Sequence, residues 1–113
     1  MSEGVLEVLD RAVEAAEDAD DVLRETVRIL AAEPGVAWVG IALLDEGALV
    51  PGPAAGEPDE ARRVRTPIVW QGAAVGELQV DGDVERQLLE AVAAMIATHV
   101  LIGWDTGGEA WEP

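Results

Sequence analysis

The sequence predicts an α+β fold in which one antiparallel sheet carries helices on one face. Three observations lead to it: apolar residues at helical spacing in the first third, four short β-like runs in the middle, and a long amphipathic stretch near the end. Runs of strands between terminal helices favour an antiparallel sheet that is covered on one side. We expect one domain over 1–113, made of a helical N-terminal segment (1–33), the sheet (36–81), a C-terminal helix (83–103) and a tail (104–113).

Two helical segments are expected before residue 34. Apolar residues recur at helical spacing in the first at Val5, Leu6, Leu9, Val13 and Ala16, and in the second at Val22, Leu23, Thr26, Val27 and Leu30. The acidic cluster 17–21 offers Asp20 or Asp21 as the N-cap of the second segment, which ends at Pro34 and Gly35. The sequence leaves open whether this cluster breaks one helix or only bends it.

The strands differ in how much of each is expected to be buried. The first run ends at the turn 45–47 and is apolar on both faces, which predicts a central strand. Residues 51–63 are dense in Pro and Gly and predict a loop, with one helical turn possible from Asp59 to Arg63. In the third strand, Pro67 predicts an edge position or a bulge, because proline cannot donate a hydrogen bond to a neighbouring strand.

The helix expected at 83–103 is the clearest element. Its apolar stripe consists of Leu88, Val92, Met95, Ile96, His99, Val100 and Gly103. With Ala93 and Ala97 added, the apolar surface is broader than one buried face requires. Either this helix meets a second copy of the chain, or all of it packs onto its own sheet.

The charge of the chain limits its partners. Among 113 residues, 23 are acidic and seven are Arg, with no Lys, so the net charge is −16. Such a surface repels nucleic acids and anionic membranes, and neither is expected as a partner. No apolar run approaches the roughly 18 residues of a membrane span, and the acidic N-terminus lacks the features of a signal peptide. A cytoplasmic location is the resulting expectation.

Several kinds of chemistry lack their residues in this sequence. With no Cys, thiol catalysis, disulfides and Cys-bound metal sites are excluded. Ser2 is the only serine, so a Ser-His-Asp arrangement is not expected, and neither GxGxxG nor GxxxxGK occurs. The single histidine, His99, lies on the apolar stripe and is more typical of a core or interface residue than of a metal ligand. We therefore expect no cofactor, no metal and no enzymatic activity.

Two segments resemble the free methionine-(R)-sulfoxide reductases, which have the GAF fold. AWVGIALLDEGALVPGPAAGEP is similar to the stretch of that family that runs W-V-G, a hairpin, G-P and G-x-P. TPIVWQGAAVGELQVDGD is similar to its V-P-I, turn glycine and V-x-G-x-L-x-x-D segment. The resemblance covers roughly 31–100 with one large internal gap. It implies a minimal GAF-like fold with the terminal helices on one side of the sheet and a small-molecule pocket on the other.

The departures from that family exclude its reaction. Where the G-x-P motif of the family leads into its first functional cysteine, this chain has GEPDEAR, and sulfoxide reduction needs a thiolate to attack the sulfur. In the resemblance, Trp38 corresponds to the substrate tryptophan and Asp81 to the second of two strand aspartates. Gln79 replaces the first aspartate, and the glutamate before the V-P-I strand falls at or beside Arg63.

Strand alternation places the candidate ligand-binding residues on one face. Trp38 shares a strand face with small residues, and Glu77, Gln79 and Asp81 share one face of the fourth strand. With Arg63, these residues are the predicted site, which we expect to favour a cationic or zwitterionic small molecule. The alternatives are a core tryptophan that fills the space left by the family's missing lid, for Trp38, and an ordinary solvent-facing strand for the three polar residues.

These observations predict a non-catalytic GAF-like sensory or regulatory module that dimerises through its terminal helices and binds a small molecule weakly. The expected homodimer has Leu88, Val92, Ile96 and His99 near its seam. The alternative is a protein–protein interaction module that uses the uncovered sheet face around Trp38, and a less favoured third class is an enzyme that uses carboxylates alone. A concavity at Trp38 favours the ligand, whereas an exposed apolar sheet face favours the interaction module.

Overall fold

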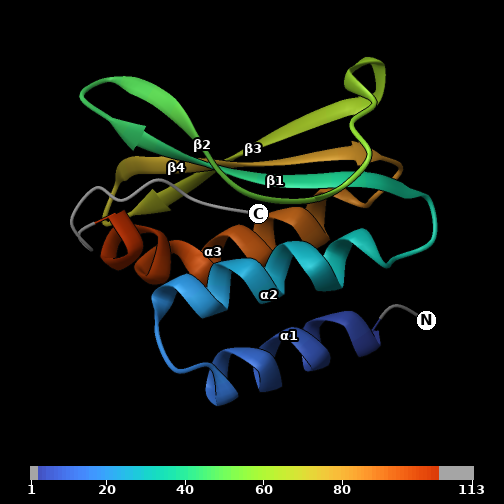
Figure 1. Cartoon of the computed structure of the whole chain (residues 1–113), viewed down its shortest axis with the longest axis horizontal. Coiled ribbons are helices and arrows are strands. Elements are labelled where there is room, and N and C mark those ends of the chain that lie inside the picture. The colour runs from blue at the N-terminus through green and yellow to red at the C-terminus, as the bar shows by residue number, and fades with distance from the viewer. Residues whose placement is uncertain (1–2, 105–113) are drawn as a thin grey trace.

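A four-stranded sheet lies above two successive layers of helices (Figure 1). The computed structural model describes residues 3–104, with side chains described within 4–100, so the predicted tail lies outside the described residues except for Trp104. The elements in chain order are α1 (Glu3–Ala15), α2 (Ala19–Ala31), β1 (Val36–Asp45), β2 (Ala48–Gly56), the 3-10 turn η1 (Glu60–Arg62), β3 (Arg63–Trp70), β4 (Ala73–Gly82) and α3 (Arg86–Trp104). The predicted α+β order is confirmed.

β1 is a central strand, as its sequence predicts. The sheet order is β2-β1-β4-β3 and all neighbours are antiparallel. Alternate residues of β1 point toward the helices and are fully buried, namely Val39, Ile41 and Leu43. Leu78 and Val80 of the neighbouring β4 lie beside them and are also fully buried. Within residues 3–104, no α-helix covers the opposite face of the sheet (Figure 1).

Both edge strands contain proline. β3 is an edge strand with a register shift between Ile68 and Val69, so Pro67 lies in a strand that is both at the edge and irregular, as predicted. The loop predicted to begin at residue 51 is wrong, because β2 continues to Gly56. Proline is tolerated there since β2 is the other edge of the sheet. Within β2, Gly52 is required by close packing, because a Cβ there would lie 2.4 Å from the Ile41 carbonyl oxygen.

The acidic cluster breaks the N-terminal helical region into two helices. α1 ends at Ala15, and the Asp18 side chain caps α2 by accepting a hydrogen bond of 2.9 Å from the Asp21 backbone N–H. The expected cap at Asp20 or Asp21 is therefore wrong. Extended backbone geometry at Asp18 turns its carboxylate toward the first turn of α2, where Asp20 and Asp21 are already helical. The two helices run antiparallel, with α1 forming the outer layer over α2 (Figure 1).

The broad apolar surface of α3 is accounted for within one chain. α3 packs under β3 and β4, beside α2 under β1 and β2, so the sheet and α2 bury two sides of it: Leu89, Val92, Ala93, Ile96, Ala97 and Val100. The prediction that Val92 and Ile96 lie at a dimer seam is wrong, because both side chains are fully buried in the core of their own chain. Leu88 and His99 are partly exposed. A homodimer stays a prediction without this seam, and sedimentation of the chain at micromolar concentration measures it directly.

A bilayer-spanning helix is not found among residues 3–104. Each of the helices described there is too short or too polar to cross a membrane.

Candidate ligand pocket on the helix-free face

Strand register brings the five predicted site residues together on the helix-free face. Trp38 of β1 lies opposite Asp81 of β4, and Gly40 lies opposite Gln79. On the other side of β4, Arg63 pairs with Asp81 and Arg65 pairs with Gln79. Because directly opposite residues in antiparallel strands share a face, these side chains form one continuous surface across β1, β4 and β3. Glu77 extends the same row of β4 by one alternation.

The Trp38 indole lies over Gly40. A Cβ on Gly40 would stand 2.3 Å from Cη2 and 2.6 Å from Cζ2 of Trp38, so only glycine leaves room for the ring. The Arg63 guanidinium carbon lies 4.4 Å from the centroid of the Trp38 ring, within the range of a cation–π contact. Trp38 is partly exposed, and its register opposite Asp81 places it on the helix-free face.

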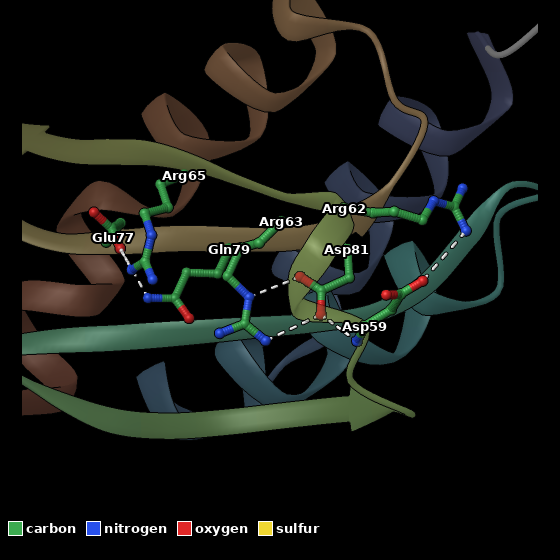
Figure 2. A network of polar contacts seen from close by, with 7 residues as sticks. All are labelled: Asp59, Arg62, Arg63, Arg65, Glu77, Gln79 and Asp81. Carbon is green, nitrogen blue, oxygen red and sulfur yellow. Dashed lines mark hydrogen bonds and ion pairs between the residues drawn. The ribbon is translucent and has the colours of Figure 1, made fainter.

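Asp81 is a fully buried carboxylate with three hydrogen-bond donors. Its Oδ1 accepts from Arg63 Nε at 2.7 Å, and its Oδ2 accepts from Arg63 Nη2 at 3.0 Å and from the Asp59 backbone N–H at 2.6 Å (Figure 2). The hydrogen bonds from the Arg63 guanidinium are the main cause that lowers the pKa of Asp81 below its ordinary value, against the opposing effect of burial. Asp81 is therefore ionised at neutral pH, and its charge is matched by Arg63.

Asp81 holds a segment that crosses the sheet. β2 and β3 lie at opposite edges, so residues 57–62, here called the crossing segment, must pass over the ends of β1 and β4. The segment is tied at Glu57, whose N–H donates to the Ala37 carbonyl at 2.9 Å, and at Asp59, which donates to Asp81. The predicted helical turn at the end of this segment is confirmed as η1.

Arg62 fixes the end of the crossing segment. Its Nη2 donates to the Gly35 carbonyl at 3.2 Å, and its guanidinium lies within ion-pair distance of Asp59 and Asp83 at 3.8 and 3.6 Å. Figure 2 shows Arg62 directed away from Arg63 and Arg65, toward Asp59. Arg62 and Arg63 are adjacent in the chain but have different partners: Arg62 contacts Gly35, Asp59 and Asp83, whereas Arg63 binds Asp81.

A second polar group lies further along the face. Glu77 Oε1 accepts from Arg65 Nη1 at 2.9 Å and from Gln79 Nε2 at 2.8 Å (Figure 2). The Glu77 side chain is 19% exposed and that of Arg65 is 56% exposed, so the pair is near the surface. Both carboxylates of the predicted site are therefore already paired with arginine.

An open pocket of about 370 Å³ lies on this face. Its apolar side comes from β2 and β1, with Leu49, Pro51, Ala54 and Trp38. Its polar side comes from β3 and β4, with Arg63, Arg65 and Gln79, and the crossing segment adds Pro58 and Glu60 at the rim. The volume is at the lower end of the range typical of small-molecule sites.

Only one of the three polar residues of β4 in the predicted site lines the pocket. A cationic or zwitterionic ligand was expected because Glu77, Gln79 and Asp81 share a face near Trp38, but neither carboxylate contributes to the lining. Sequence reasoning missed Arg65 and Glu60. Alternation along β3 from Arg63 would have found Arg65, whereas Glu60 depends on the path of the crossing segment, which the sequence does not indicate.

Other candidate sites are weaker. The His99 side chain lies on α3, and partial burial lowers its pKa. Within the described residues, no group of three or more His, Asp or Glu is arranged to hold a metal ion. The large hydrophobic side chains exposed in the described part of the chain are scattered over several elements, at Val8, Leu49, Val64 and Val69. They do not form the apolar sheet face that the interaction module requires.

No family model matches the sequence, and a search of curated proteins likewise finds no match. Solved structures do match. The GAF domain of a Coxiella burnetii phosphoenolpyruvate-protein phosphotransferase has a TM-score of 0.76 at 14% identity, covering 94% of this chain and 96% of its own. The corresponding Acinetobacter GAF domain has a TM-score of 0.72 at 17% identity, covering 96% of this chain and 100% of its own.

Two reductases match at a lower TM-score. The type II free methionine-R-sulfoxide reductase of Thermoplasma acidophilum has a TM-score of 0.63 at 18% identity, over 74% of this chain and 92% of its own. The fRMsr of Staphylococcus aureus, solved in complex with its substrate, has the same TM-score and identity over 85% of this chain and 95% of its own. At these identities the likeness concerns the fold. The chain has the GAF fold, with its helices on one face of the sheet and an open pocket on the other.

Proposed function

We propose that this chain is a non-catalytic regulatory module of the GAF type that binds a small molecule in the pocket beside Trp38. The observation that carries the proposal is the packing of the Trp38 indole between the backbone of Gly40 and the Arg63 guanidinium. Trp38 thereby forms part of the wall of a pocket of about 370 Å³.

Pre-organisation of the pocket supports binding. Arg63 is held by two hydrogen bonds to a buried carboxylate, and the same carboxylate anchors the crossing segment that forms the rim. A wall whose side chains are already fixed loses little conformational entropy when a ligand arrives. The pocket therefore supports binding without a large rearrangement.

The absence of catalysis is proposed on chemical grounds. Among the solved structures of similar fold, some are reductases of a sulfoxide, but this chain has no Cys to form the required intermediate. Of the carboxylates near the pocket, Asp81 and Glu77 are held by arginines, which leaves Glu60 on the pocket wall. A single exposed carboxylate does not supply the paired acid and base of a carboxylate enzyme.

The experiment is a thermal-shift screen with a matched pair of variants. The panel contains monocarboxylates, amino acids, nucleotides and neutral aromatic compounds. Ala54→Leu places a larger side chain in the pocket, because Ala54 of β2 is an exposed lining residue. Ala74→Leu is the control, because it adds the same bulk at an exposed position of β4 that does not line the pocket. A panel member present at about a hundred times its Kd is expected to raise Tm by roughly 5 °C or more.

That shift is expected in the wild type and in Ala74→Leu, and to be abolished in Ala54→Leu. A panel in which nothing stabilises the wild type would overturn the proposal. So would a compound that stabilises both variants equally, because it would then bind elsewhere.

A further inference from the structure

We infer that the Trp38 pocket selects small monocarboxylates that carry an apolar group, and discriminates against cations of the same shape. This inference rests on the proposed function, because it names the ligand class of the same pocket. It reverses the charge preference that the sequence predicts for this face.

The distribution of charge supports an anion. The chain has a net charge of −16 and only seven arginines, yet two of them, Arg63 and Arg65, line this one pocket. Asp81 is fully buried, and neither Asp81 nor Glu77 contributes to the lining. The charged side chains that a ligand contacts in the lining are therefore the two guanidinium groups and the exposed carboxylate of Glu60.

Both guanidinium groups have N–H donors left for a ligand. Arg63 uses Nε and Nη2 on Asp81, and among the described residues its Nη1 has no hydrogen-bond partner. Arg65 uses Nη1 on Glu77, which leaves its Nε and Nη2 without partners in the same part of the chain. A carboxylate can accept from such donors, and charge-assisted bonds of this kind are among the stronger hydrogen bonds in proteins. The two arginines alternate along β3 and so present their donors on the same face.

The opposite side of the pocket fixes the rest of the ligand. Leu49, Pro51 and Ala54 of β2 form an apolar wall, separated by β1 and β4 from the arginines of β3, whereas the Trp38 ring lies against the Arg63 guanidinium. A ligand that spans the pocket would place its charged group toward β3 and its apolar group toward β2. A cation in the same orientation would be repelled by Arg63 and Arg65, whose charges act at short range even where salt screens the distant acidic surface.

The experiment compares three probes of one shape. Phenylacetate is the anion, phenylacetamide its neutral isostere and phenethylamine a cation of similar size. Each is titrated into the ¹⁵N-labelled full chain at 150 mM salt, and amide shifts of Gly40, Arg65 and Gln79 report on the pocket. Arg65→Gln removes one cation from the lining, and Arg86→Gln makes the same change of charge at an exposed position on α3.

Phenylacetate is expected to produce saturable shifts at these amides, with a Kd about tenfold lower than that of phenylacetamide. Arg65→Gln is expected to raise the Kd of phenylacetate about tenfold and to leave that of phenylacetamide unchanged, whereas Arg86→Gln changes neither. If phenylacetamide or phenethylamine binds the pocket as tightly as phenylacetate, the anion preference is overturned while the small-molecule function stands. If none of the probes binds, the inferred ligand class is overturned, and the broader screen alone decides the proposed function.

Discussion

Arg63 and Asp81 are register partners on β3 and β4, and their side chains form a bidentate ion pair with N–O distances of 2.7 and 3.0 Å. The pair lies at the junction of three features, because Asp81 also accepts from the crossing segment and Arg63 also covers Trp38. Asp81, which corresponds to a strand aspartate of the reductases in the sequence resemblance, thus has a structural role in this chain. The side chain that it positions is Arg63.

The first prediction concerns the stability that Asp81 provides. Asp81→Asn keeps the shape of the side chain but leaves Arg63, which is only 14% exposed, without a counter-charge. The free energy of unfolding is expected to fall by about 3 kcal/mol, as for other broken buried ion pairs. Glu77→Gln is the control, because its partner Arg65 is exposed and the loss should stay below about 1 kcal/mol. Urea denaturation of both variants measures this, and equal losses would contradict it.

The same pair predicts a pH dependence. Because folding lowers the pKa of Asp81, the native state binds this proton less tightly than the unfolded chain. The stability that Asp81 contributes is complete above about pH 5 and is lost as pH falls through the unfolded value of about 3.9 and on through the lower folded pKa. The difference in unfolding free energy between the wild type and Asp81→Asn should therefore shrink from pH 5 to pH 3. A difference that holds constant over that interval would argue against an ionised Asp81 as its source.

The seat of Trp38 predicts a coupling between two residues. Gly40→Ala places a methyl group 2.3 Å from Trp38 Cη2, so the indole must leave its position. We expect a loss of stability of about 1–2 kcal/mol, a changed Trp38 emission and loss of ligand binding. In a Trp38→Ala background the same substitution should cost almost nothing, because the backbone at Gly40 does not require glycine and the clash is gone. Additive effects in this double-mutant cycle would show that the Trp38 ring does not pack on Gly40.

Burial of α3 predicts the fate of a charge at Ile96. Because Ile96 is fully buried in its own chain, Ile96→Glu is expected to cost more than about 4 kcal/mol and to unfold the protein, rather than to separate two folded copies. Ala94→Glu introduces the same charge on the exposed side of α3 and should leave circular dichroism and Tm nearly unchanged. A folded Ile96→Glu protein would show that the packing of α3 is not as described.

Most of the fold could be predicted from local patterns. The apolar run of β1 identifies a central strand, Pro67 identifies an edge, and alternation places Trp38, Gln79 and Asp81 on one face. The course of β2 could not be predicted, because Pro and Gly normally indicate a loop and only the position of β2 at the sheet edge makes them acceptable in a strand. In each of these cases the residue pattern carries information about its own strand but little about the neighbouring one.

The chemistry of the site was less accessible to sequence reasoning. Glu77 and Asp81 look like free carboxylates in the sequence, and only the pairing of β3 with β4 brings Arg65 and Arg63 against them. Similarly, the width of the apolar stripe on α3 suggested a second copy of the chain, although α2 and the sheet cover it from two sides. Both errors arise because partners distant in sequence decide which side chains remain available.

The position of a bound ligand tests the central claim most directly. We would take the panel compound that stabilises the chain most and record intermolecular nuclear Overhauser effects between its protons and those of the protein. The pocket proposed here predicts effects to the Trp38 indole and to the Ala54 methyl group, which line it together. Effects confined to Leu30 and Leu88, which line a separate cavity of about 210 Å³ between α2 and α3, would contradict the account.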